Sequence, residues 1–328
     1  MKRNSAIDLL KFVAVFFVMN SHMYMCYGRY DYLSTGGAMG DALFFFSSGF
    51  TLLLGRNLPF DNWYKRRISR IYPSVLAAAI FALIFWGFHE DIGDVLIGKR
   101  YWFLGCILVY YIFFYPIRFF GEGKYLMPVF VCWAAICVII YLVFYKDVEF
   151  YRRSNFRCYA FFLFMLQGAW MGKHQTSYHL KSIHVALCLL CIVVWYALCY
   201  LGRGNSIYLL SLIPLLGFTR YTYIILTARI FDKLYNTRTT GGIIYIISQL
   251  CLEVYLIQKF VFTDQLNFLF PLNIPLIMLA VLIVAYLVKM LAELILQTFR
   301  TESYDWKGML LYRKPTKTSQ QQNNTVLN

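Results

Sequence analysis

A long apolar run near the N-terminus constrains what this chain can fold into. The run extends from Ala6 to Tyr27, which is enough for a helix that crosses a bilayer, since such a helix needs about 20 mostly apolar residues. It nevertheless carries five polar side chains: Asp8, Lys11, Asn20, Ser21 and His22. Polar and ionisable groups are costly inside a membrane, so each of them needs a partner, a water-filled cavity or a function.

Lys11 and His22 share one face of this predicted helix. Eleven residues separate them, which corresponds to about 16 Å along a helix axis and about 20° beyond three full turns. Histidine suits proton transfer because its imidazole ordinarily titrates near neutral pH. Two interpretations of His22 stay open: a general base, or a buried neutral imidazole that bonds to a neighbouring helix. The other four histidines fall in or beside predicted loops: His89, His174, His179 and His184.

The composition of the whole chain indicates an integral membrane protein. Of its 328 residues, 60% are hydrophobic and 14% are charged, whereas an ordinary soluble domain is about 25% charged. The apolar runs predict an all-α polytopic bundle of about ten transmembrane helices, over 5–27, 38–55, 73–89, 101–119, 125–145, 156–172, 182–202, 205–219, 241–262 and 273–299. Residues 1–300 form one integral-membrane domain in this prediction, and residues 301–328 form a polar, disordered cytoplasmic tail. The segment from Arg220 to Arg238 is predicted to be an interfacial helix.

The net charge of +15 is explained by membrane topology, without a nucleic-acid partner. If both termini are cytoplasmic, 20 of the 31 Lys and Arg residues lie in cytoplasmic segments, nine lie in outer segments, and Lys11 and Lys289 lie in the membrane. This bias is the one expected of multi-pass membrane proteins with cytoplasmic termini. The segment from Lys146 to Arg157 departs from it, with four basic residues on the outer side. That departure indicates either a miscounted helix or a basic mouth that faces an anionic acceptor.

The nine cysteines predict neither a disulfide framework nor a metal site. Most of them lie within apolar runs, where free cysteine behaves as a small hydrophobic side chain. Cys188 and Cys191 have the spacing of a metal knuckle, but a second pair of ligands is missing from their surroundings in the sequence.

Two further motifs follow the first run. Ser47, Ser48 and Gly49 lie in the middle of the second predicted span, where small residues permit close helix packing and hydroxyls bond between helices. A basic cluster, Arg66, Arg67 and Arg70, then leads into the third span. It is either a cytoplasmic anchor or a binding site for a polyphosphate, because arginine pairs with phosphate through two parallel N–H donors.

In this order, the motifs resemble those of the acyltransferase-3 family, the integral-membrane O-acyltransferases that modify bacterial surface glycans. Family members open with a basic residue, ten residues and a histidine, which Lys11 and His22 match. An FF-x-x-SG-type helix and an R-R-x-x-R-x-x-P-like loop come next. The corresponding segments here are Phe45–Phe50, reading FFSSGF, and Arg66–Pro73, reading RRISRIYP; YWFL at 101–104 and SQLCLEVYLIQ at 248–258 continue the match.

Two positions depart from the family pattern. The basic residue of the first helix is more often arginine, and Lys11 lacks the bidentate fork of a guanidinium. The late helix ends in Gln258, where many relatives have a histidine. These departures put the roles of Lys11 and Gln258 in doubt and leave His22 untouched.

The resemblance implies a multi-pass acyltransferase of the bacterial cytoplasmic (inner) membrane. It would move an acyl group, acetyl by family default, from cytosolic acyl-CoA to a hydroxyl of a lipid-linked or surface polysaccharide, without a permanently bound cofactor. His22 is the expected base, with Lys11 and Ser48 as further catalytic residues. The phosphates of CoA are assigned to Arg66, Arg67 and Arg70. Glu253, Tyr255 and Gln258 are the candidate acceptor residues, and bonding between helices is the open alternative for Glu253 and Gln258.

Three other functions compete with acyl transfer. A transporter of polysaccharide or lipid-linked sugar would show broken helices in repeated halves, and the sequence shows no such repeat. A glycan polymerase or ligase usually needs a large outer loop, whereas the predicted outer loops are short. A non-catalytic membrane scaffold would leave the order of the three motifs unexplained.

Overall fold

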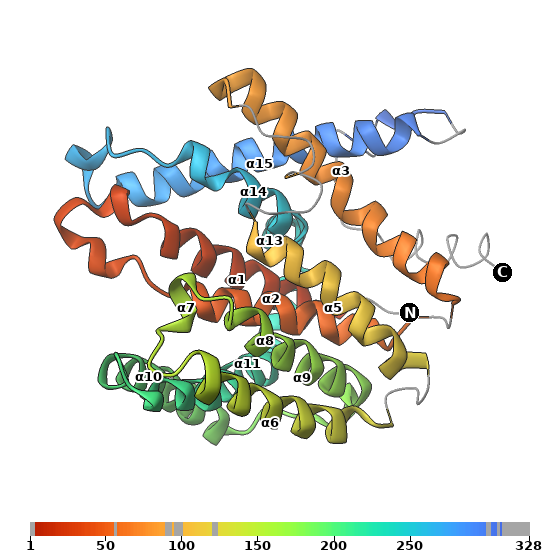
Figure 1. Ribbon diagram of the computed structural model, residues 1–328. Helices are drawn as coiled ribbons and strands as arrows, with labels where there is room; N and C mark the ends of the chain where they lie inside the picture. The colour runs from red at the N-terminus through yellow and green to blue at the C-terminus, as the bar shows by residue number, and fades with distance from the viewer. Residues whose placement is uncertain are drawn as a thin grey trace.

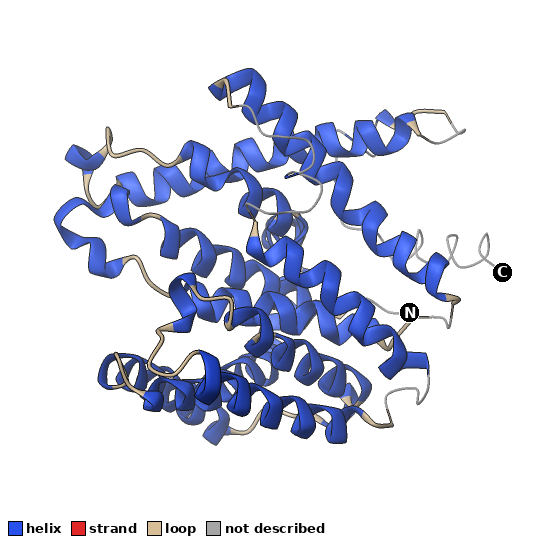
Figure 2. Ribbon diagram, viewed as in Figure 1, coloured by secondary structure: helices blue, strands red, loops and turns tan. Residues whose placement is uncertain are grey.

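The computed structural model describes residues 4–55, 58–88, 101–119 and 124–299, together with 94, 303–306 and 309. Within these residues the regular structure is entirely helical, without strands (Figure 2). The charge count above includes Arg56, Lys99 and Arg100, which lie outside the described residues. Most of the predicted tail, 301–328, also lies outside them.

Among the described residues, seven helical spans are long and apolar enough to cross a membrane. They are α1 (Ser5–His22), α3 (Phe60–Trp86), α5 (Trp102–Phe119), α6 (Leu126–Phe144), α10 (Ser182–Leu201), η3 with α11 (Ser206–Leu226), and α15 (Asn273–Thr298). An eighth span results if α13 (Arg238–Gln249) and α14 (Cys251–Val261), which are bent by 75° at their junction, cross together. The chain is therefore an all-α polytopic membrane protein, as the sequence predicts.

Two predicted spans correspond to shorter helices. The second is α2 (Gly37–Leu52), which follows the short helix η1 (Tyr24–Leu33). The sixth is divided between α8 (Arg157–Ala160) and α9 (Phe162–Lys173), and the short α7 (Phe150–Arg153) precedes it. The prediction of about ten uninterrupted spans therefore exceeds the number of long helices, because it could not detect these breaks in the helical hydrogen bonding.

The pair α1–α2 forms the centre of the bundle. In Figure 1 it lies between one group of helices that contains α3, α14 and α15 and another that contains α6, α9, α10 and α11. The beginning of α1 and the end of α15 lie at the same end of the molecule (Figure 1). This arrangement agrees with termini on one side of the membrane.

Glycines let α2 pack directly on the backbones of its neighbours. A Cβ added at Gly49 would lie 1.9 Å from the carbonyl oxygen of Met165 in α9, and one at Gly168 would lie 2.0 Å from that of Phe46. On the opposite side of α2, a Cβ at Gly40 would lie 2.6 Å from a methyl group of Val18 in α1. This is the close helix approach that small residues make within membranes.

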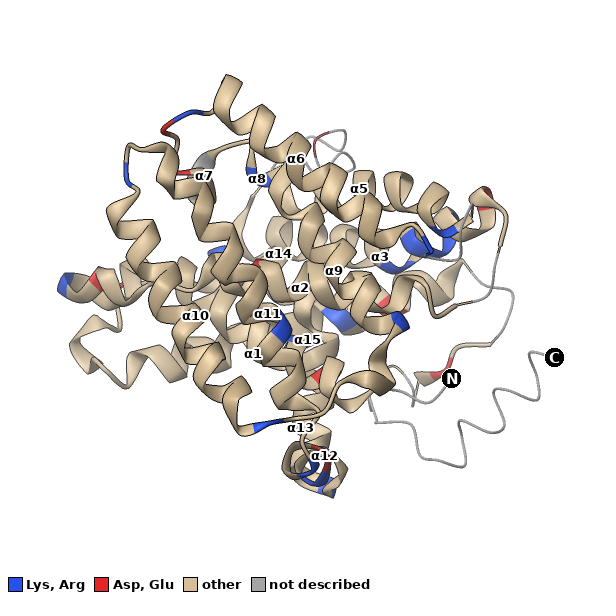
Figure 3. Ribbon diagram, turned by 90° about the horizontal axis from the view of Figure 1, so that it is seen from below, with Lys and Arg blue, Asp and Glu red and all other residues tan. Residues whose placement is uncertain are grey.

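The structure departs from the sequence prediction after Thr219. The predicted span ended there, with an interfacial helix from Arg220, but α11 continues to Leu226. The extension is stabilised because Tyr223 is buried with its ring 5.0 Å from that of Phe50 in α2. Only the short α12 (Arg229–Asn236), which carries both basic and acidic residues (Figure 3), matches the predicted interfacial segment.

The close contact between α2 and α9 predicts a large cost for a single methyl group. Gly168→Ala should lower the free energy of unfolding by about 1–3 kcal/mol, because overpacking forces the helix backbones apart. The measurement is the thermal unfolding temperature of the purified protein in detergent. Gly242→Ala is the control, since a Cβ there meets nothing within 4 Å. Equal effects of the two substitutions would contradict the packing.

Candidate functional site

The last three residues of α1 are polar, and their environments differ. Asn20 accepts a hydrogen bond of 2.5 Å from the Tyr27 hydroxyl and donates to two backbone carbonyls of the following loop. The Ser21 hydroxyl donates to the carbonyl oxygen of Val18 at 2.9 Å. His22 is half-buried, and its ring makes no hydrogen bond with any residue that the structure describes. Asn20 and Ser21 therefore have structural roles, whereas the imidazole of His22 is not committed to a neighbouring helix.

Two cations from different helices lie within electrostatic range of His22, and one of them contacts further side chains. Arg157 in α8 and Lys259 in α14 are close enough to act electrostatically on the His22 ring. The Arg157 guanidinium carbon lies 4.1 Å from the ring centroid of Trp102, the first residue of α5. Asp41, in the second turn of α2, is within electrostatic range of Arg157. We refer to these five residues as the His22 cluster.

Arg157 is a member of this cluster that sequence reasoning did not single out. Arg157 ends the segment from Lys146 that departs from the charge bias. That departure could have indicated a functional residue, because cations are uncommon on the outer side of a membrane protein. The structure supplies a reason for this cation, because Arg157 lies over the ring of Trp102 and within electrostatic range of Asp41 and His22.

Two of the predicted acceptor residues in α14 lie near the His22 cluster. The Tyr255 hydroxyl accepts a hydrogen bond of 3.4 Å from the backbone N–H of Phe103 and is within electrostatic range of Asp41 and Arg157. The Gln258 side chain is fully buried, and neither its amide nitrogen nor its amide oxygen has a partner among the described residues. Since a buried polar group without a hydrogen bond costs about 1–3 kcal/mol, this amide calls for a water molecule or a ligand.

Glu253 is held in a separate ion-pair network between helices. Its Oε1 atom accepts a hydrogen bond of 2.5 Å from Ser74 in α3 and lies 3.3 Å from the Nζ atom of Lys289 in α15. Its Oε2 atom is buried without a hydrogen-bond partner among the described residues. Lys289 also lies 3.4 Å from Glu293, one turn further along α15. The contact of Lys289 with Glu253 could not be predicted, because the two residues come from different helices.

Lys11 lies beside the break between α13 and α14. Its carbonyl oxygen accepts a hydrogen bond of 3.9 Å from the Cys251 thiol, and its ammonium group is within electrostatic range of that thiol, as are Asp8 and Glu253. Asp8 is buried and accepts a hydrogen bond of 2.5 Å from the Tyr235 hydroxyl. The structure therefore places Lys11 among these groups, about three helical turns from His22 along α1.

The predicted arginines gather at the opposite end of the α1–α2 pair. Arg66 and Arg70 are exposed on α3. Arg67 is half-buried, with its guanidinium carbon 5.4 Å from the ring centroid of Trp63 and 5.7 Å from that of Tyr111 in α5. We refer to Arg66, Arg67 and Arg70 as the arginine cluster.

Ser48 lies near the arginine cluster, at the end of the α1–α2 pair that is opposite to His22. Its hydroxyl is 3.1 Å from that of Tyr111, which also contacts Arg67. Gly37, at the start of α2, packs on Ser21. Ser48 is eleven positions further along α2, which corresponds to about 16 Å of helix. Of the three predicted catalytic residues, the structure therefore brings neither Lys11 nor Ser48 to His22.

Arg118 is a further arginine near the arginine cluster, and the sequence did not reveal its role. It is buried near the end of α5, and its two terminal nitrogens donate to the carbonyl oxygens of Leu52, at 2.5 Å, and Gly55, at 2.7 Å. These bonds satisfy carbonyls at the C-terminal end of α2, which would otherwise lack partners. Arg118 is also within electrostatic range of Arg67. An arginine at the end of an apolar run is common, so its sequence position carried no signal.

Comparison with known protein families identifies one match. A family model described as an acyltransferase domain, Acyl_transf_3, matches residues 4–291. The matched segment contains both clusters and all predicted site residues. Neither the comparison with curated proteins nor that with solved structures found a match.

The contacts of Glu253 predict a structural role that can be tested. Lys289→Met should lower the free energy of unfolding by about 3–5 kcal/mol, because it leaves the buried Glu253 carboxylate without its cation. Thermal unfolding in detergent is the measurement. The control is Glu293→Gln, which removes the more exposed of the two carboxylates and should cost less than about 1 kcal/mol. Equal losses would show that Glu253 does not depend on Lys289.

Proposed function

Because this chain belongs to the acyltransferase-3 family, we propose that it is an O-acyltransferase of the bacterial cytoplasmic membrane. It moves an acyl group, acetyl in the simplest case, from cytosolic acyl-CoA to a hydroxyl of a cell-envelope sugar or polysaccharide. The observation that carries this proposal is the presence of two different polar sites, the His22 cluster and the arginine cluster, at opposite ends of the α1–α2 pair. The charge bias assigns the arginine end to the cytoplasm.

The His22 cluster provides the chemistry of the transfer step. His22 accepts the proton of the acceptor hydroxyl while the hydroxyl oxygen attacks the thioester carbonyl. The carbon–sulfur bond then breaks, and the imidazolium returns the proton to the CoA thiolate. Arg157 or Lys259 stabilises the negative charge that develops on the carbonyl oxygen. If His22 itself takes the acyl group first, the same residue and the same cations are used.

The arginine cluster provides the site for the phosphates of the donor. Arg66 and Arg70 are exposed, and Arg67 is oriented by the rings of Trp63 and Tyr111, so three guanidinium groups are available on one helix. Arginine binds phosphate through charge-assisted, often bidentate, hydrogen bonds. In this arrangement the thioester arm of the donor extends along the α1–α2 pair, from the side of Ser48 toward His22. Lys11 lies between the two ends of that path.

The acceptor side of the proposal relies on Tyr255 and Gln258. Both lie on α14 near the His22 cluster, and Gln258 has an amide without a partner among the described residues. An amide both donates and accepts hydrogen bonds, as a sugar hydroxyl also does. Glu253, in contrast, is engaged by Ser74 and Lys289, so we assign it to the support of α14.

Transport without chemistry is the alternative that the structure addresses. A repeat-built transporter has broken helices at corresponding positions in two halves. The described residues contain one such bent pair, α13 with α14. The match to the acyltransferase family favours acyl transfer over transport.

Removal of the His22 imidazole tests the proposed chemistry. His22→Ala should reduce acyl transfer at least about 100-fold, the usual contribution of a general base, while insertion and accumulation in the membrane stay normal. Mass spectrometry of the surface glycans measures the acyl content. The control is His179→Ala, because that side chain is exposed and outside the helices. Wild-type acylation by the His22 variant would refute the assignment.

Loss of the arginine charges should affect the donor and spare the acceptor. The double substitution of Arg66 and Arg67 by glutamine should raise the dissociation constant for acyl-CoA at least about tenfold, because it removes charge-assisted bonds to phosphate. Calorimetry of acyl-CoA binding to the purified protein is the measurement. Lys65→Gln removes a neighbouring exposed charge and should change the affinity little. An unchanged donor affinity would contradict this proposal and would show that the cluster serves only as a cytoplasmic anchor.

A further inference from the structure

Arg220 is a cation within a candidate membrane span, and it has no ionic partner among the described residues. It lies in α11, within the membrane-spanning segment Ser206–Leu226. Six more helical residues follow it, which places it about 9 Å from the end of the span. Its side chain is exposed and makes neither a hydrogen bond nor an ion pair with any described residue. A charged group at such a depth ordinarily has a partner or a function.

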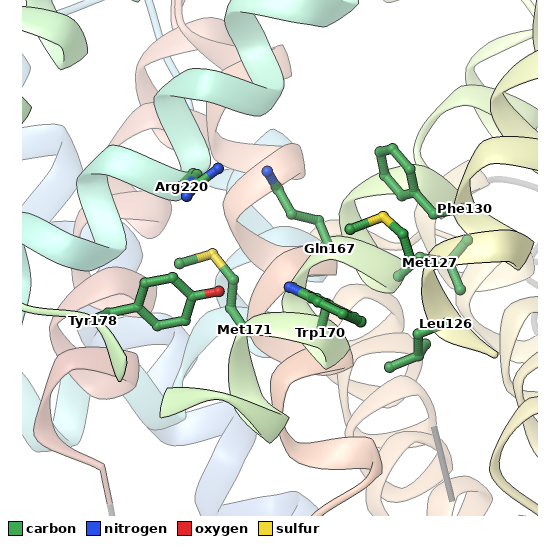
Figure 4. A pocket seen from close by; sticks show the side chains of 9 residues that line it. Leu126, Met127, Phe130, Gln167, Trp170, Met171, Tyr178 and Arg220 are labelled. Atoms are coloured by element: carbon green, nitrogen blue, oxygen red, sulfur yellow. The ribbon is translucent and has the colours of Figure 1, made fainter. Parts of the chain in front are cut away.

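A pocket opens next to Arg220 between α6, α9 and α11. In Figure 4, Arg220 and Tyr178 lie on one side of it, and Met127 and Phe130 of α6 lie on the other. Gln167 also lines the pocket, but its amide is engaged, since Nε2 donates to the Leu216 carbonyl and Oε1 accepts from the Thr219 hydroxyl. Arg220 is therefore the lining side chain with a full charge and no bond to the described protein.

The size and position of the pocket limit what can occupy it. Its volume of about 190 Å³ is several times the share of one water molecule, about 30 Å³, but smaller than the roughly 300–1,000 Å³ of sites that enclose a whole drug-sized ligand. It therefore suits one segment of an elongated ligand whose remainder stays outside.

The pocket adjoins a helix surface that faces lipid. Met127, at the pocket, is 45% exposed, and Val131, one turn further along α6, is 59% exposed. Such apolar exposure on a spanning helix is a contact surface for acyl chains. The pocket is at the arginine end of the molecule, because Gly172, next to the lining residue Met171, packs on Phe50 near the end of α2.

From these observations we infer that the pocket binds an anionic phospholipid of the surrounding bilayer. The phosphate pairs with Arg220, and the upper part of one acyl chain lies between Met127, Phe130 and Met171. The pairing neutralises the cation within the span, and the chain segment fills a space that the protein's own side chains leave open. This site is separate from both the His22 cluster and the arginine cluster, and it does not depend on the proposed function.

The test measures lipid binding in the absence of acyl transfer. The purified, delipidated protein is heated in detergent with phosphatidylglycerol, phosphatidylcholine, glycerol phosphate or CoA. Phosphatidylglycerol should raise the unfolding temperature of the wild type by about 2–4 °C, and the other three should not. Arg220→Gln should abolish this shift. Arg229→Gln, which removes an equal, exposed charge from α12, should keep it.

A second variant and native mass spectrometry complete the test. Met127→Trp fills the mouth of the pocket and leaves Arg220 in place, so it should also lose the shift and the bound phosphatidylglycerol seen in the mass spectrum. An equal shift in Arg220→Gln and the wild type would overturn the inference, because lipid would then bind by general surface charge. A shift with glycerol phosphate or with CoA would overturn it as well, in favour of a free-phosphate or nucleotide site.

Discussion

The close packing of α1 against α2 is the interaction on which the rest of the structure depends. A Cβ added at Gly40 would lie 2.6 Å from a methyl group of Val18, and one at Gly37 would lie 2.6 Å from the hydroxyl of Ser21. This contact fixes the two helices relative to each other, so the position of every polar side chain along them is set. It directs His22 toward α8 and α14, and it carries Ser48 to the opposite end, against α5.

In a membrane protein, the hydrogen-bond partners of a buried polar side chain indicate whether it needs a ligand. Asp8 is bonded by Tyr235, and the Oε1 atom of Glu253 is bonded by Ser74 and Lys289. These contacts offset the cost of burying those atoms. In contrast, the His22 ring and both polar atoms of the Gln258 amide have no hydrogen-bond partner among the described residues. The proposed chemistry rests on that contrast.

Local patterns in the sequence predicted the helical class, most of the spans and the two ends of the α1–α2 pair. Apolar length marks a spanning helix, and the order of the Lys11–His22, SSG and arginine motifs indicated the family that the match over 4–291 shows. The interruptions at Leu250 and Phe161 were not predicted, because hydropathy averages over a break. The roles of three residues depend on contacts with other helices, which no single segment of sequence predicts: Arg157, Arg118 and Glu253.

The central claim is that donor and acceptor act at opposite ends of one helix pair, and sidedness tests it most directly. The protein would be reconstituted into liposomes in a known orientation, with isotopically labelled acyl-CoA on the arginine side and the acceptor glycan on the His22 side. The account predicts labelled acceptor only in this arrangement, and none when the two substrates are exchanged between the sides. Equal labelling when both substrates are confined to one side would contradict it.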